Sequence, residues 1–448
     1  MPDKKREGFA SRLGFILVSA GCAVGIGNVW KFPYVAGSNG GAFFVLVYLF
    51  FLALIGVPVL SMELSVGRAG KSTSIVAIKK LEHKGTKWHI TGWAGLLGCY
   101  LLMFYYTTVS GWMLTYFWKY ISGSLYGVSE EQVPDVFNSL LADPLTMTIF
   151  MVIIVIAGFV VIAFGVQKGL ERVNKVMMAG LFLIIIGLTV NSLLLKDAGK
   201  GIEFYLVPNG NIIKDIGIVK IVSNAMSQAF FTLSIGIGAM EVFGSYMSSE
   251  TSIAGDAVRI CVLDTFVAIM AGLIIFPACS SFGVDTAEGP SLIFVTLPCI
   301  FSDMKGGMIW GALFFLFMTF ASFSTIIAVF ENLVTNITDV FGFSRRRSII
   351  INLVIVLVFS MPCVLGFNLL STDVLGFEDY IVSKILLPLG SLAYVLFCSF
   401  KKGWGFDSYL KECNTGEGAK IKHSYATFYR YVLPLMILFI FVMGLLPS

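Results

Sequence analysis

The stretch Ala20-Gly21-Cys22-Ala23-Val24-Gly25-Ile26-Gly27-Asn28 places three glycines within seven residues, inside a long apolar run. A second interruption, Phe230-Phe231-Thr232-Leu233-Ser234-Ile235-Gly236-Ile237-Gly238, lies in the other half of the chain. Glycine weakens a helix, and backbone groups freed at mid-membrane have to line a cavity or bind a ligand. Two broken helices at matching places in two halves of a chain therefore predict a binding site where they meet.

The composition is that of an integral membrane protein. Of the 448 residues, 57% are hydrophobic and 13% charged, and the mean hydropathy is +0.87. A water-soluble domain carries roughly a quarter charged residues. The apolar runs are long and unbroken, for example 146–165 and 177–195, whereas a membrane β-barrel shows short alternating segments. We therefore predict an all-α membrane protein.

We predict eleven transmembrane helices, with spans 1–5 and 6–10 forming two inverted five-helix repeats and breaks in helices 1 and 6. The predicted spans are 12–37, 41–66, 90–121, 145–165, 174–196, 217–248, 256–283, 306–339, 348–368, 377–400 and 426–446. The corresponding domains are an N-terminal segment 1–11, a first repeat 12–200, a second repeat 201–402, and a loop with the eleventh span, 403–448.

The basic residues predict the orientation. Loops on the side of the N-terminus hold most of the lysines and arginines, including the run 345–347, while the opposite loops are acidic. The positive-inside rule then puts the N-terminus in the cytoplasm of a bacterial-type plasma (inner) membrane. The start, 1–8, is polar and does not read as a cleavable signal peptide. The net charge of +4 follows this topology, so we expect no nucleic-acid partner.

The sequence offers little for catalysis. The three histidines lie in predicted loops, and the eight cysteines are scattered without metal-ligand spacing. No nucleophile with a base is expected at membrane depth, and no repeated filter loop suggests a channel. We therefore expect a transporter and not an enzyme.

Several motifs resemble one family. Arg12-Leu13-Gly14 through Gly25-Ile26-Gly27-Asn28-Val29-Trp30-Lys31-Phe32-Pro33-Tyr34 looks like the first span of the neurotransmitter:sodium symporters, and Asn39-Gly40-Gly41-Ala42-Phe43 and Gln228 to Ser234 also match. The chain resembles the bacterial eleven-span members, which include the leucine and hydrophobic or aromatic amino-acid transporters. This implies a secondary active, alternating-access symporter with amino-acid substrate and Na⁺ as partners, in membrane lipid, as a monomer or weak dimer.

The resemblance implies two Na⁺ sites. Sodium site one would use Ala23, Asn28, Thr232 and Asp264. Sodium site two would use Gly21, Val24, Ala321, Ser324 and Thr325. The last three lie at i, i+3 and i+4 and so share one helix face. In chloride-dependent relatives the anion sits near the position of Asp264, so we expect this carboxylate to supply the charge and to make transport chloride-independent.

Family resemblance also predicts the substrate pocket. Its expected residues are Cys22, Ala23, Gly25, Gly27, Leu102, Tyr106, Phe231, Thr232, Ser234, Ile237, Ser324, Thr325 and Val329. Monoamine-carrying relatives have an aspartate where this chain has Gly25. The substrate would therefore bring its own carboxylate, and the apolar lining favours a neutral hydrophobic or aromatic amino acid.

One gate is expected on each side of this pocket. Outside, Lys31 would pair with Glu378 or Asp379. Inside, Arg6 would meet Asp339, near Phe9 and Tyr246. Glu241 could be a structural acid, a vestibule residue or a proton acceptor. Two alternatives to sodium symport therefore stay open, namely a proton-coupled or proton-antiporting transporter and a transporter-fold amino-acid sensor.

Overall fold

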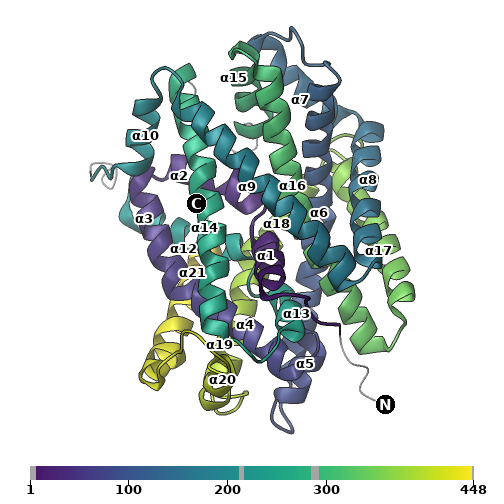
Figure 1. Ribbon diagram of the computed structural model, residues 1–448, viewed down its shortest axis with the longest axis vertical. Coiled ribbons are helices and arrows are strands. Elements are labelled where there is room, and N and C mark those ends of the chain that lie inside the picture. Colours follow the sequence, from purple (N-terminus) through teal and green to yellow (C-terminus); the bar gives the residue numbers. More distant parts are fainter. Residues whose placement is uncertain (1–6, 211–215, 284–291, 446–448) are drawn as a thin grey trace.

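The computed structural model describes residues 7–210, 216–283 and 292–445. This part of the chain is helical, without a named strand; its isolated bridge joins Thr251 to Glu417. The helices stand roughly side by side in one bundle (Figure 1). Short helices α5 and α20 lie at the end that also holds the N-terminus, and α7, α10 and α15 lie at the opposite end.

The first five spans follow the predicted order, with short helices between them. Their elements are α1 (Arg12–Ala23), η1 (Gly27–Lys31), α2 (Phe32–Ser38), α3 (Ala42–Phe51), η2 (Leu52–Gly56), α4 (Val57–Gly70), α6 (His89–Ile121), α8 (Pro144–Ala163), η4 (Val166–Glu171) and α9 (Arg172–Leu193). The connecting elements are α5 (Ser74–Leu81), η3 (Glu130–Gln132), α7 (Val133–Ala142) and α10 (Ala198–Leu206).

The remaining six spans complete the bundle. Their elements are α12 (Ile218–Leu233), α13 (Ala239–Tyr246), α14 (Ile253–Phe282), α16 (Gly307–Phe341), α17 (Arg345–Gly366), α18 (Val374–Tyr380), η6 (Ile381–Leu386), α19 (Leu387–Ser399), η8 (Phe428–Val432) and α21 (Leu433–Leu445). The connecting elements are η5 (Leu292–Thr296), α15 (Leu297–Asp303), α20 (Phe406–Cys413) and η7 (His423–Tyr425).

The number of spans agrees with the prediction. Among the described residues, eight helices are long and apolar enough to cross a membrane, or nine when α1 and η1–α2 count as one bent span. The two further spans are α6, which is largely buried and rich in tyrosine, and the broken pair α12 and α13.

Both predicted breaks are present. Span 1 bends by 54° between its two helical parts. In span 6 the helix ends at Leu233, and Ser234, Gly236 and Gly238 all have positive φ angles (51°, 101° and 73°) before α13 begins. Gly236 has a second constraint, since a Cβ there would lie 2.2 Å from the Leu387 carbonyl oxygen. The glycine motifs therefore interrupt these helices as the sequence indicated.

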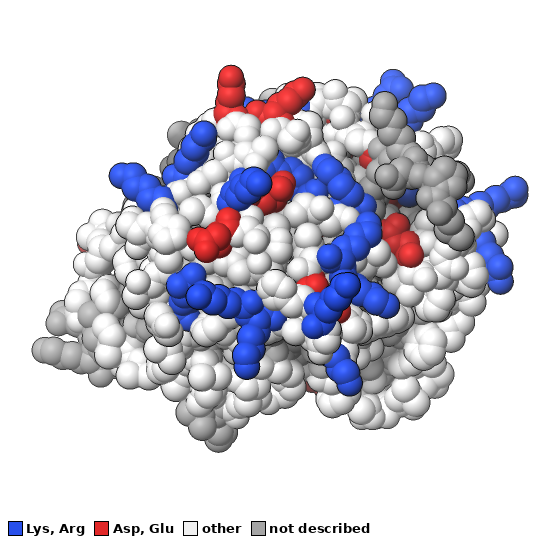
Figure 2. All heavy atoms as spheres, turned by 90° about the horizontal axis from the view of Figure 1, so that it is seen from below, with Lys and Arg blue, Asp and Glu red and all other residues white. Residues whose placement is uncertain are grey.

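The bundle end near the N-terminus carries the basic residues. Figure 2 looks onto this end and shows many Lys and Arg side chains with fewer acidic ones. This is the charge distribution on which the predicted cytoplasmic orientation rests.

Candidate substrate and ion site

The broken parts of spans 1 and 6 meet around a buried cavity. Its lining residues are Ala23, Gly25, Gly27, Leu102, Tyr106, Phe231, Ser234, Val382 and Leu387. Seven of these belong to the predicted substrate pocket. Tyr106, on α6, is tied to the break in span 1 because its hydroxyl accepts a hydrogen bond from Ile26 N at 2.9 Å.

Two glycines make this close approach possible. A Cβ on Gly25 would lie 2.2 Å from the Tyr106 hydroxyl and 2.7 Å from Thr325 Oγ1. A Cβ on Gly27 would lie 2.9 Å from the Phe231 ring. Any larger residue, including the aspartate of monoamine-carrying relatives, would therefore displace Tyr106 or Thr325 at position 25.

The other predicted pocket residues are buried but do not line this cavity. They are Cys22, Thr232, Ile237, Ser324, Thr325 and Val329. The Ile237 carbonyl, for example, accepts the Cys99 thiol at 3.4 Å. Val382 and Leu387, at the π-helical turn of span 10, do line it. The sequence reasoning missed both, because an apolar residue in an apolar span has no local signal.

Oxygen atoms of α1 and α16 gather on the α16 side of the break in span 1. Ser324 Oγ lies 2.9 Å from the Gly21 carbonyl oxygen and 2.8 Å from that of Ala321. Thr325 Oγ1 lies 3.3 Å from the carbonyl oxygens of Gly21 and Val24. All five predicted residues of sodium site two therefore contribute an oxygen to one cluster. Carbonyl and hydroxyl oxygens are the ligands that hard cations prefer.

A second polar cluster surrounds Asp264, which is fully buried. Its Oδ1 accepts Asn28 Nδ2 at 2.8 Å, and its Oδ2 accepts Thr232 Oγ1 at 2.9 Å. Asn28 Oδ1 in turn accepts Gly25 N at 3.1 Å. Asp264 thus contacts Asn28 and Thr232, two of the other three residues predicted for sodium site one. The fourth, Ala23, is the last residue of α1.

These clusters suit an alkali cation better than a transition metal. Among the described residues, no group of three or more His, Cys, Asp or Glu side chains could hold a metal ion. Transition metals favour nitrogen, sulfur or several carboxylates, whereas both clusters here are built mainly from neutral oxygens.

A larger cavity of about 210 Å³ shares Tyr106 and Phe231 with the inner one, and Lys31 and Asp379 are on its wall. Lys31 Nζ lies 3.6 Å from Asp379 Oδ2 and 3.7 Å from the centre of the Phe231 ring. Tyr105 also donates to Asp379, at 3.1 Å. Glu378 is buried, and of the two candidates it is Asp379 that pairs with Lys31.

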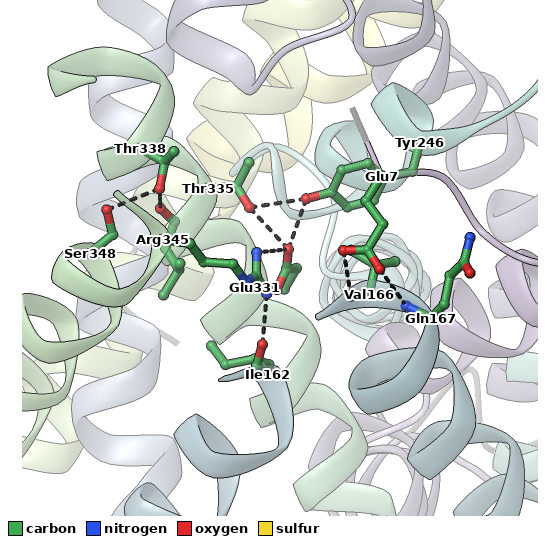
Figure 3. A network of polar contacts seen from close by, with 11 residues as sticks. Glu7, Ile162, Val166, Gln167, Tyr246, Glu331, Thr335, Thr338, Arg345 and Ser348 are labelled. Carbon is green, nitrogen blue, oxygen red and sulfur yellow. Dashed lines mark hydrogen bonds and ion pairs between the residues drawn. The ribbon is translucent and has the colours of Figure 1, made fainter. Parts of the chain in front are cut away.

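At the other end, a polar network lies where spans 6, 8 and 9 converge (Figure 3). Arg345 donates to both oxygens of the buried Glu331 at 2.5 and 2.9 Å, and Tyr246 donates to Glu331 at 2.8 Å. Phe9 packs against Tyr246 with ring centres 5.9 Å apart. The sequence reasoning missed the Glu331–Arg345 pair, although an intramembrane carboxylate is itself a signal.

The inner gate expected from the sequence is described only in part. Asp339 accepts a hydrogen bond from Thr73 N at 2.9 Å. Arg6 lies outside the described residues. Glu7 follows it and accepts the amide protons of Val166 and Gln167 (Figure 3), which ties the N-terminal segment to the start of span 5.

Discontinuous helices that meet at a buried site, with cavities and ion pairs on either side, define an integral membrane transporter. The chain belongs to the sodium:neurotransmitter symporter family, whose model matches residues 6–139 and 130–447. It is 35% identical over 451 residues to an uncharacterized sodium-dependent transporter of Bacillus subtilis, covering 99% of this chain and 98% of the relative. An uncharacterized sodium-dependent transporter of Haemophilus influenzae is 31% identical, with 99% of both chains covered.

A solved structure has the same fold. The crystal structure of MhsT in complex with L-phenylalanine aligns with a TM-score of 0.88 and 36% identity, covering 98% of this chain and 100% of that one. The predicted family and fold class are therefore confirmed.

Proposed function

We propose that this protein is a sodium-coupled symporter of neutral hydrophobic or aromatic amino acids that carries two sodium ions per substrate and needs no chloride. The observation that carries the proposal is the convergence of two oxygen clusters and an apolar cavity on the break in span 1. The substrate would lie in the inner cavity, and the ions would bind the clusters around Asp264 and around Ser324 and Thr325.

The substrate class follows from the two ends of the cavity. Backbone amides of the break near Gly25 and Gly27 and the Tyr106 hydroxyl suit a carboxylate, and none of the described residues that line the cavity is acidic. A monoamine would offer no carboxylate to the Tyr106 hydroxyl. Leu102, Phe231, Val382 and Leu387 give the rest of the wall an apolar character, and the related MhsT has been solved with L-phenylalanine.

The ions would supply the driving force and the order of steps. Two charges crossing 100 mV supply roughly 4.6 kcal/mol, which concentrates a substrate about a thousandfold or more. Sodium at the Ser324 and Thr325 cluster would hold α1 against α16. Its departure would free the inner half of span 1, next to the Glu331–Arg345 pair that closes that end.

Chloride independence rests on Asp264. Its carboxyl group lies beside Thr232 and Asn28, and in its ionised form it would supply the anion of this site. A second small anion in the same dry surroundings would be repelled.

Proton coupling is a second candidate, favoured by two further buried carboxylates. Glu63 Oε1 accepts the amide proton of Gly236, and Glu241 accepts the Tyr394 hydroxyl. Both acids are fully buried, and buried carboxylates are frequent proton carriers in transporters.

Uptake into liposomes tests the proposal. The purified protein would be reconstituted and offered a panel of labelled amino acids with sodium or choline outside. Sodium-dependent accumulation of a neutral apolar amino acid is expected. Accumulation that follows a pH gradient without sodium would favour proton coupling, and binding without accumulation would favour a sensor.

A further inference from the structure

A polar seam runs between α1 and α9, starting at the Ser324 and Thr325 cluster. The contact face of α1 carries glycines one heptad apart, Gly14 and Gly21. A Cβ on Gly21 would lie 2.6 Å from Asn174 Oδ1, and one on Gly14 would lie 1.9 Å from Glu171 Oε1. The glycines of span 1 therefore make room for two polar side chains of span 5.

Asn174 is buried without using its hydrogen-bonding groups. Its side chain is fully inaccessible, and neither Oδ1 nor Nδ2 makes a hydrogen bond to any described part of the chain. A buried polar group without a partner is costly, on the order of 1–3 kcal/mol. A buried polar side chain without a hydrogen bond between two packed helices therefore needs an explanation other than packing.

Its place in the fold suggests the reason. The amide lies against Gly21, and the carbonyl oxygen of Gly21 is part of the ion cluster, 2.9 Å from Ser324 Oγ. Asn174 thus packs against the residue that supplies one of the ligands of the cluster. An amide oxygen is a ligand of the same kind as the backbone carbonyls that form this cluster.

The seam continues to the bundle end near the N-terminus. Glu171, the last residue of η4 and three residues before Asn174, accepts Ala10 N at 2.7 Å and Ser11 Oγ at 3.0 Å. Lys175 donates to Glu171 at 2.6 Å and is about one-third exposed. A buried carboxylate paired with a partly exposed lysine therefore marks the outlet of the seam.

We propose that Asn174 is an additional sodium ligand, which receives the ion through Oδ1 as it leaves the Ser324 and Thr325 cluster toward the Glu171 end of the seam. This inference rests on the proposed sodium coupling. Asn174 would lower the barrier to release and would not be part of the resting site, because Gly21 stands between it and the cluster.

The test compares two fluxes through the same protein in liposomes. Net uptake driven by an inward sodium gradient requires sodium release in every cycle. Exchange of labelled for unlabelled substrate, with equal high sodium on both sides, does not require net release. Asn174→Leu removes the oxygen and keeps the branching at Cγ, and Asn174→Asp keeps a side-chain oxygen. Thr189→Val is the matched control, since Thr189 is also on α9 and its buried hydroxyl also lacks a hydrogen bond to the described residues.

Asn174→Leu is expected to lower net uptake about tenfold, the effect of losing one ligand to a charged group, while exchange stays within about twofold of wild type. Asn174→Asp should recover net uptake at least in part, and Thr189→Val should change neither flux. Equal losses in both fluxes, or no loss in either, would overturn the inference. If Asn174→Leu does not fold, the net-to-exchange ratio of Asn174→Ala, which also lacks a side-chain oxygen, decides in the same way. A wild-type protein without sodium-dependent uptake would instead overturn the proposed function.

Discussion

Replacing Gly25 by alanine probes the tightest contact of the site. The new Cβ would lie 2.2 Å from the Tyr106 hydroxyl, and ordinary contact begins near 3.4 Å, so the hydroxyl would have to retreat by about 1.2 Å. A shift of that size breaks the 2.9 Å bond from Ile26 N and moves the proposed carboxylate donor. Two hydrogen bonds at about 1–1.5 kcal/mol each predict a loss of substrate affinity of about 30- to 150-fold.

Equilibrium binding of the preferred amino acid to purified protein in saturating sodium measures this loss. Gly187→Ala is the matched control, because a Cβ at Gly187, on span 5, meets no atom of the described residues within 4 Å. The control should bind as wild type does. If Gly25→Ala bound with wild-type affinity, Tyr106 would not be a carboxylate donor and the assignment of the inner cavity would be wrong.

Three further predictions concern charged residues. Asp264→Ala removes the carboxylate that Asn28 and Thr232 share, so uptake should fall by at least about tenfold in chloride-free buffer and recover in part when chloride is added. Chloride stimulation of the wild type would contradict this reasoning. Lys31→Ala should change substrate binding by less than about fivefold, because the partly exposed pair with Asp379 contributes about 0–1 kcal/mol. Arg345→Ala leaves Glu331 buried without its cation, and an unpaired buried charge costs on the order of 3–5 kcal/mol. The melting temperature should therefore fall clearly, or limited proteolysis should show that the inner end of the bundle opens more readily. If Lys31→Ala and Arg345→Ala both had small effects, the argument that burial makes the Glu331–Arg345 pair the stronger one would be wrong.

Much of the fold could be predicted because its signals are local. Runs of apolar residues mark the spans, and glycine clusters at 21–27 and 234–238 mark the breaks. The π-helical turns could not be predicted. In span 10, for example, the turn Ile381–Leu386 has no distinctive residue, yet Val382 and Leu387 reach the cavity there.

The residues of the candidate site could be predicted where they lie in a family motif. They could not be predicted where the choice was between adjacent residues of one helix. Glu378 and Asp379 are adjacent in sequence, but successive residues of a helix point about 100° apart, so only one of them faces Lys31. The Glu331–Arg345 pair joins two different spans. Nothing in either segment alone specifies the partner, and only the packing of α16 against α17 brings the two together.

The most direct test of this account is the ratio of sodium to substrate carried into the same liposomes, measured with two radioactive labels. The proposed mechanism predicts two sodium ions for each neutral amino acid and the same ratio with or without chloride. Accumulation of the amino acid with no sodium movement, driven by a pH gradient alone, would contradict sodium coupling and would require Glu63 and Glu241 to carry the coupling ion.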